Sequence, residues 1–146
     1  MTTEVTLDSS VLVSALVEHE KRRPVARGIM KRLFDGDLHV VTSAIVPVEV
    51  CGAIARRASI PAAKKAISQL QKWSDMRLIE YADLTQERSR KSAQLAVDLR
   101  IRGMDAIVIQ VAREMESALI TFDEEMAKKA KSVTKVADPE DFASDR

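Results

Sequence analysis

The chain has 146 residues, with 23 lysines and arginines against 22 aspartates and glutamates and a formal net charge of +1. This length suffices for one domain with its own hydrophobic core, so we expect a single domain over residues 1–146. One cysteine and two widely spaced histidines exclude a disulfide framework and a Cys/His zinc site. No apolar run approaches the roughly 18 residues of a membrane span, and the N-terminus lacks a signal-like pattern, so we expect a cytoplasmic protein with no membrane partner.

Short apolar runs alternate with segments of helical spacing along the whole chain. In chain order the pattern predicts a strand at 4–8, helices at 9–20 and 24–36, a strand at 38–42, helices at 43–57 and 61–74, a strand at 76–82, helices at 85–101 and 102–112, a strand at 118–122, a helix at 124–131 and a strand at 134–137. We expect Gly103 to break the helix over 85–101. Strands that alternate with helices indicate an α/β sandwich built on a mostly parallel sheet.

Four acidic residues stand alone in otherwise apolar segments. In sheets of this type, ligands bind at the carboxyl ends of the strands, beside the helix N-termini. Asp8 and Asp123 follow predicted strands, whereas Glu49 and Asp105 lie in the predicted helices. No basic residue lies at helical contact spacing within any of these apolar runs. Because isolated buried carboxylates are costly, we expect the four to converge at one edge of the sheet.

A local role is open for each of these acids. Asp8, Asp105 and Asp123 are each placed to stabilise a helix N-terminus. Glu49 lies among valines beyond the first turn of its predicted helix, where a solvated surface role is the alternative. The joint pattern favours a shared site, because clustered carboxylates need a compensating cation and offer only oxygen ligands. Such a ligand set selects Mg²⁺ or Mn²⁺ and suits metal-assisted phosphodiester hydrolysis.

The four acidic segments, TLDSSVLVSAL, VPVEV, RGMDAIVIQVA and LITFDEEM, resemble those of the PIN domain family, in particular the VapC-like ribonuclease toxins of bacteria and archaea. The resemblance extends over residues 4–142. It implies a three-layer sandwich with a central parallel sheet, a homodimer, an endoribonuclease that depends on Mg²⁺ or Mn²⁺, an RNA substrate and often a small antitoxin protein. Exposure of the apolar helices near residues 9–17 and 26–34 would also favour a homodimer.

The resemblance also implies roles for particular residues. Asp8 and Asp105 would be direct metal ligands, Glu49 would bind the ion or orient its water, and Asp123 would hold the ion directly or through water. Ser10 and Thr121 would line the pocket with their hydroxyl groups.

RNA must also be held by its backbone. The basic candidates are residues 21–23, Arg56 with Arg57, and Arg100 with Arg102, although each group is also consistent with a solvated helix face. Arg100 and Arg102 are favoured because they lie close to Asp105 in sequence. One tryptophan and one tyrosine do not suggest an aromatic platform for stacked bases.

Three other classes of protein are alternatives to this interpretation. A phosphatase of the haloacid dehalogenase type requires a second aspartate two residues after the first, where this chain has Ser10. A receiver domain requires an acidic pair before Asp8, which the sequence VTLD lacks. A PIN-like module that binds RNA or protein without cutting remains the alternative.

Overall fold

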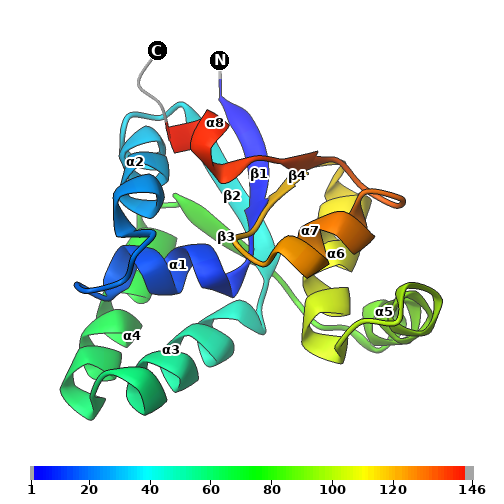
Figure 1. The fold of residues 1–146 in the computed structure, drawn as a ribbon, viewed down its shortest axis with the longest axis horizontal. Coiled ribbons are helices and arrows are strands. Elements are labelled where there is room, and N and C mark those ends of the chain that lie inside the picture. The colour runs from blue at the N-terminus through cyan, green and yellow to red at the C-terminus, as the bar shows by residue number, and fades with distance from the viewer. Residues whose placement is uncertain (1, 144–146) are drawn as a thin grey trace.

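One parallel sheet runs through the centre of the molecule in the computed structural model, which describes residues 2–143 (Figure 1). The strand order is β3-β2-β1-β4-β5, and all four pairings are parallel. The strands are β1 (Thr3–Leu7), β2 (Leu38–Ser43), β3 (Ile79–Ala82), β4 (Ala118–Ile120) and β5 (Val136–Ala137). The α/β class predicted from the sequence is confirmed.

Helices cover both faces of this sheet. Within the described residues they are α1 (Ser9–Leu16), α2 (Arg23–Phe34), α3 (Val46–Arg57), α4 (Ile60–Asp75), α5 (Gln86–Leu99), α6 (Gly103–Met115), α7 (Glu124–Ala130) and α8 (Pro139–Ala143). Figure 1 shows α1 to α4 on one side and α5 to α7 on the other. Helix α6 packs on β1, β2 and β4, and α5 packs on α6. The arrangement is a three-layer sandwich.

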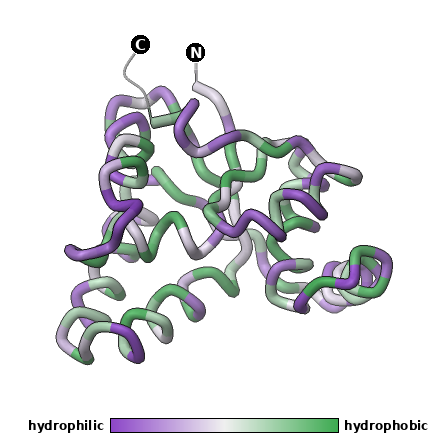
Figure 2. The backbone as a smooth tube through the Cα atoms, in the orientation of Figure 1, coloured by the Kyte–Doolittle hydropathy of each residue, from purple (hydrophilic) through white to green (hydrophobic). Residues whose placement is uncertain are grey.

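The hydrophobic core lies between the sheet and these helices. Val5, Leu7 and Val40 on the central strands are fully buried, because helices cover both faces of the sheet. Figure 2 shows the same division along the chain, with the hydrophilic residues concentrated in peripheral segments such as the connection between α1 and α2. No helix within residues 2–143 is long and apolar enough to cross a membrane.

Several helix ends differ from the sequence prediction, and the ends of α1 and α5 have a local explanation. Helix α1 stops at Leu16, not at residue 20, because the following segment carries Glu18 and Glu20, and negative charge is unfavourable at a helix C-terminus. Helix α5 ends at Leu99, where Arg100 takes a left-handed conformation with φ of 53°. Gly103 therefore does not break α5; it is the first residue of α6.

Helix α8 was not predicted from the sequence. It is only five residues long, which is too short for a periodic apolar pattern. The available signal was Asp138 before Pro139, since aspartate favours the position before a helix and proline its first turn. The Asp138 carboxylate accepts a hydrogen bond from the backbone of Glu140 at 3.0 Å.

The contact between α2 and α8 depends on Gly28. A Cβ atom at this position would lie 2.7 Å from the backbone oxygen of Ala143, which is closer than real Cβ atoms approach such an oxygen. We expect Gly28→Ala to lower the free energy of unfolding by about 1 to 3 kcal/mol through this overlap. Equilibrium denaturation with urea measures the change.

Gly52→Ala on α3 is the matched control. Its Cβ would meet only the flexible end of Arg56, at 3.4 Å. Because alanine favours a helix more than glycine does, this variant should be as stable as the wild type or more stable by up to about 1 kcal/mol. Equal stability of Gly28→Ala and Gly52→Ala would contradict the close contact between α2 and α8.

Candidate active site

Asp8 is the most buried of the four acidic residues singled out in the sequence. It follows β1 directly, with 4% of its surface exposed. Its backbone N–H donates to the carbonyl of Ile120, the last residue of the neighbouring strand β4, at 3.0 Å. Asp123 follows β4 by three residues, so the two aspartates come from adjacent strand ends. Strand β4 is shorter than predicted, because residues 121 and 122 leave the sheet.

Two hydroxyl groups fix the Asp8 carboxylate. Thr121 Oγ1 and Ser10 Oγ both donate to Asp8 Oδ2, at 2.8 and 2.9 Å. Ser10 Oγ accepts from the backbone N–H of Phe122, and Thr121 Oγ1 accepts from that of Asp123, each at 3.0 Å. Because an ionised carboxylate can only accept hydrogen bonds, both hydroxyl groups donate their hydrogens to Asp8. The carboxylate is therefore held in one orientation as an acceptor.

Glu49 lies in the first turn of α3 and not beyond it as predicted, because α3 begins at Val46 and not at residue 43. Its side chain is half-buried, and its Oε1 atom is buried without a hydrogen-bond partner within the described part of the chain. Burial, the largest cause, and the charges of Asp8 and Asp105 together raise the pKa of Glu49 to about 7, although Arg102 opposes them. A buried acceptor without a partner indicates a place where a ligand or water is needed.

Asp105 is the third residue of α6, where the helix dipole favours a negative charge. Burial nevertheless raises the pKa of this carboxyl group above its ordinary value, with Asp8 and Asp123 adding to the effect and Arg102 opposing it. The charges that act on Glu49 and Asp105 show that all four acids share one electrostatic environment. The structure thus brings the four predicted residues to one edge of the sheet.

Arg102 is the cation of this cluster. Its Nε lies 3.5 Å from Asp105 Oδ2, and its Nη2 lies 3.6 Å from Asp123 Oδ2. No basic residue lies within the apolar run of Asp105, but Arg102, just outside that run and three residues before Asp105, supplies a basic neighbour. Its side chain is 80% exposed, so solvent weakens both ion pairs.

Two of the acids also have the local role that their sequence position suggested. Asp123 Oδ1 accepts from the backbone N–H of Met126 at 3.0 Å and so caps α7. Asp8 precedes α1 in extended conformation and accepts, at 3.5 Å, from the backbone N–H of Ser10. Helix capping and convergence on one site are therefore compatible, because each carboxylate has two oxygens.

A cavity of about 160 Å³ adjoins Asp105 and Asp123. Its polar and charged lining includes Arg100, Arg102 and Lys129, which the bend at Arg100 and the last turn of α7 bring together. Lys129 Nζ donates to the Arg100 carbonyl at 2.9 Å. Lys129 was not predicted from the sequence, because only the fold brings α7 next to the bend at Arg100.

The donor set suits a hard divalent cation, although the side chains are not in ligating positions. Within residues 2–143, no three acidic, histidine or cysteine side chains lie close enough together to hold an ion as they stand. The cluster supplies only carboxylate and hydroxyl oxygens, which Mg²⁺ and Mn²⁺ prefer. The unpartnered Glu49 Oε1 and the raised pKa values of Glu49 and Asp105 both fit a site that could accept a further cation beside Arg102.

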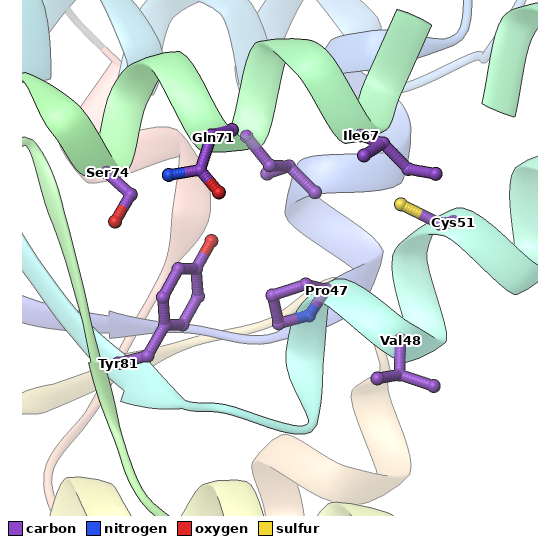
Figure 3. Close-up of a pocket in the computed structure, with 8 residues that line it drawn as sticks. Pro47, Val48, Cys51, Ile67, Gln71, Ser74 and Tyr81 are labelled. Atoms are coloured by element: carbon purple, nitrogen blue, oxygen red, sulfur yellow. The ribbon is translucent and has the colours of Figure 1, made fainter. Parts of the chain in front are cut away.

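A second, apolar cavity of about 440 Å³ lies between α3, α4 and β3 (Figure 3). Cys51 lines it, and burial raises the pKa of this thiol, which is the wrong direction for a nucleophile. The Tyr81 hydroxyl points into this space, and burial together with Cys51 raises its pKa to about 12. None of the four acids lines this cavity, so the acidic cluster is the better candidate for chemistry.

Comparisons with solved structures reveal similar folds. VapC20 of Mycobacterium tuberculosis, described as a toxin that cleaves the sarcin-ricin loop, matches with a TM-score of 0.70 and 19% identity over 85% of this chain and 93% of its own. FitAcB of Neisseria gonorrhoeae matches with 0.67 and 16% identity over 92% and 97%. VapBC2 of Rickettsia felis, solved with a DNA fragment from its promoter, matches with 0.65 and 13% identity over 93% and 98%.

These identities are low enough that the structural matches show the fold alone. No curated protein sequence matches the chain. The family model of the PIN domain matches residues 5–132, which include all four acids of the cluster. The chain therefore belongs to the PIN domain family.

Proposed function

We propose that this protein is an endoribonuclease that depends on Mg²⁺ or Mn²⁺ and acts, as one PIN-like domain, as the toxin of a toxin–antitoxin pair. The observation that carries the proposal is the placement of Asp8, Glu49, Asp105 and Asp123 at the carboxyl edge of the sheet, where Arg102 pairs with two of them. Family membership supports a nuclease, and the toxins among the similar structures support the narrower assignment.

In this proposal each acid has a distinct part. Asp8 and Asp105 bind the cation directly, Glu49 binds it or orients its water through Oε1, and Asp123 contributes directly or through water. The bound ion would orient the phosphodiester, activate a water molecule and stabilise the leaving oxygen. Ser10 and Thr121 keep the Asp8 carboxylate in one orientation while this happens.

The RNA backbone requires positive charge beside these acids. Arg100 and Arg102 line the cavity that Asp105 and Asp123 border. Once a cation neutralises the carboxylates, the exposed Arg102 guanidinium can turn from Asp105 to a phosphate oxygen without leaving a buried charge unpaired. A cognate antitoxin is the other proposed partner, supported by the toxin–antitoxin systems among the similar structures.

The first test of this function is catalytic. The wild-type protein should cleave structured RNA in millimolar Mn²⁺ or Mg²⁺ and should lose that activity in EDTA. Asp105→Asn should reduce cleavage by a factor of about 10² or more, because it removes one charged ligand. Gel electrophoresis of end-labelled RNA measures the rate, and circular dichroism verifies the fold.

Asp98→Asn is the matched control, since Asp98 is exposed on α5 and its carboxylate accepts only from Gln94. This variant should retain wild-type cleavage. Cleavage that persists in EDTA would contradict the metal mechanism. RNA binding without any cleavage in Mn²⁺ or Mg²⁺ would favour the non-catalytic binding module.

A second test uses the pH dependence of stability without metal. Because the folded-state pKa of Glu49 is raised from 4.5 to about 7, the folded state favours its protonated form. The stability this provides is fully present below pH 4.5 and is lost as the pH rises towards 7. In EDTA, Glu49→Gln should therefore raise the free energy of unfolding by about 1 to 3 kcal/mol at pH 8 and by much less at pH 4.5.

Urea denaturation at both pH values measures this difference. Glu124→Gln, at an exposed position on α7, is the control and should not show the same rise. Adding Mn²⁺ should stabilise the wild type by mass action and the Glu49→Gln variant less. An equal shift of both proteins by Mn²⁺, or a lower stability of Glu49→Gln at pH 8, would show that Glu49 does not belong to the site.

We also propose a homodimer, but with an interface on a different surface from the one that the sequence suggested. The apolar residues within 9–17 and 26–34 mostly form the core, so that argument is wrong. Val48 and Ile67 instead expose 66% and 57% of their surface and line the apolar cavity between α3 and α4 (Figure 3). Exposed aliphatic side chains around an apolar hollow are typical of a protein interface.

Val48→Asp should therefore convert the dimer to a monomer, because it places a charge in the apolar contact. Light scattering at micromolar concentration measures the molar mass. Val97→Asp is the control, since Val97 is 71% exposed on α5 and does not line this cavity. A wild-type monomer would contradict the dimer, and a dimer of Val48→Asp would contradict this choice of surface.

A further inference from the structure

Arg22 is far from the acidic residues Asp105 and Asp123 in sequence, but it contacts the segment that follows β4. It lies in the hydrophilic connection between α1 and α2, at the residue before α2 begins (Figure 2). Its guanidinium carbon stands 5.1 Å from the centre of the Phe122 ring, and its Nη1 donates to the Phe122 carbonyl at 3.3 Å. These two contacts hold an exposed arginine against the segment that follows β4.

Phe122 connects this arginine to the acidic cluster. It lies between Thr121 and Asp123, and its backbone N–H donates to Ser10 Oγ at 3.0 Å. Ser10 in turn donates to Asp8 at 2.9 Å. The position of the Arg22 guanidinium is therefore fixed relative to Asp8 by a short chain of contacts.

The charge of Arg22 is not used within the described part of the chain. Arg102 pairs with two acids of the cluster, and Arg57 pairs with Glu20 at 3.0 Å. No carboxylate within residues 2–143 forms an ion pair with Arg22. A guanidinium held against Phe122, the residue before Asp123, and not paired with a carboxylate of the described residues is available to an anionic ligand.

We infer that Arg22 binds a phosphate of the RNA backbone beside the acidic cluster, an inference that rests on the proposed ribonuclease function. Guanidinium has five N–H donors in a planar fork, and the Phe122 carbonyl uses one of them. The fork matches two phosphate oxygens, and stacking on Phe122 restricts the motion of the side chain. Arg22 and the pair Arg100 and Arg102 thus supply positive charge from separate elements of the fold.

A purely structural role for Arg22 is the competing explanation, because its contacts also fasten the connection between α1 and α2 to the segment after β4. The two roles differ in their response to salt. A phosphate contact releases counterions from RNA, so its loss changes the salt dependence of binding. Loss of a structural contact lowers stability and leaves the salt dependence unchanged.

The experiment compares Arg22→Ala, Arg22→Lys and the control Arg27→Ala, each combined with Asp105→Asn so that RNA is not cut. Arg27 is exposed on α2 one turn beyond Arg22 and carries the same charge. The probe is a fluorescein-labelled single-stranded RNA oligonucleotide of mixed sequence, and fluorescence anisotropy over a series of KCl concentrations measures affinity. Thermal unfolding of each variant verifies the fold.

Arg22→Ala should weaken binding about five- to tenfold near 0.1 M salt and reduce the slope of log K against log salt by about 0.7. Arg22→Lys should restore the slope and part of the affinity, because it keeps the charge without the planar fork. Arg27→Ala should stay within about twofold of the parent. In the cleaving background, Arg22→Ala should raise KM and leave kcat close to that of the wild type.

The inference is overturned if Arg22→Ala and Arg27→Ala share the same affinity and slope, or if Arg22→Ala loses stability without a change of slope. Failure of the ribonuclease proposal would be seen separately, as wild-type protein that does not cleave RNA in Mn²⁺ or Mg²⁺. The binding measurement does not require cleavage, so the two failures remain distinct.

Discussion

Repulsion among four carboxylates at one edge of a parallel sheet is the constraint on which the site depends. Two unit charges 4 Å apart interact by about 4 kcal/mol at an effective dielectric constant of 20, so partly buried acids cannot share a site without compensation. Arg102 is the one cation that pairs with the cluster within the described residues, and it is mostly exposed to water. The pKa values of Glu49 and Asp105 are raised first by burial and then by the neighbouring carboxylates, which Arg102 offsets only in part.

The topology of the sheet explains why the acids meet. From the central strand β1 the chain proceeds to β2 and β3 on one side, then crosses to β4 on the other side of β1. The carboxyl ends of β1 and β4 therefore adjoin where the direction of the chain reverses, which is where open α/β sheets bind ligands. Asp8 and Asp123 follow these two strands, and the packing of α6 on β1, β2 and β4 directs Asp105 to the same edge.

The sequence predicted the architecture and the convergence of the acids because both depend on strong local patterns. Alternating buried strands and helices fix the class of fold, and a carboxylate next to an apolar strand marks the functional edge whatever the details of packing. Helix ends were less predictable. The left-handed turn at Arg100 is not a glycine position, and it ends α5 before Gly103 is reached.

Contacts between distant segments could not be predicted from sequence patterns. Arg22 donates to the carbonyl of Phe122, which lies 100 positions away in the sequence. Lys129 donates to the carbonyl of Arg100, at a bend that no local sequence signal specifies. The prediction that α1 and α2 expose an apolar surface was also wrong, because most of their regularly spaced apolar residues face the core. Periodicity identifies the apolar face of a helix, but packing decides whether another part of the same chain covers it.

The same repulsion affects the order in which a cation and RNA would bind at this edge of the sheet. The proposed RNA substrate would bring phosphate charges to a cluster of carboxylates, so its approach would be opposed as long as those carboxylates remain uncompensated. Arginines from separate elements lower this barrier only in part, since Arg102 is itself paired with Asp105 and Asp123. A cation that binds the acids would remove the repulsion and free Arg102 for a phosphate. Cation binding and RNA binding are therefore expected to strengthen each other, and by thermodynamic linkage each must raise the affinity for the other by the same factor.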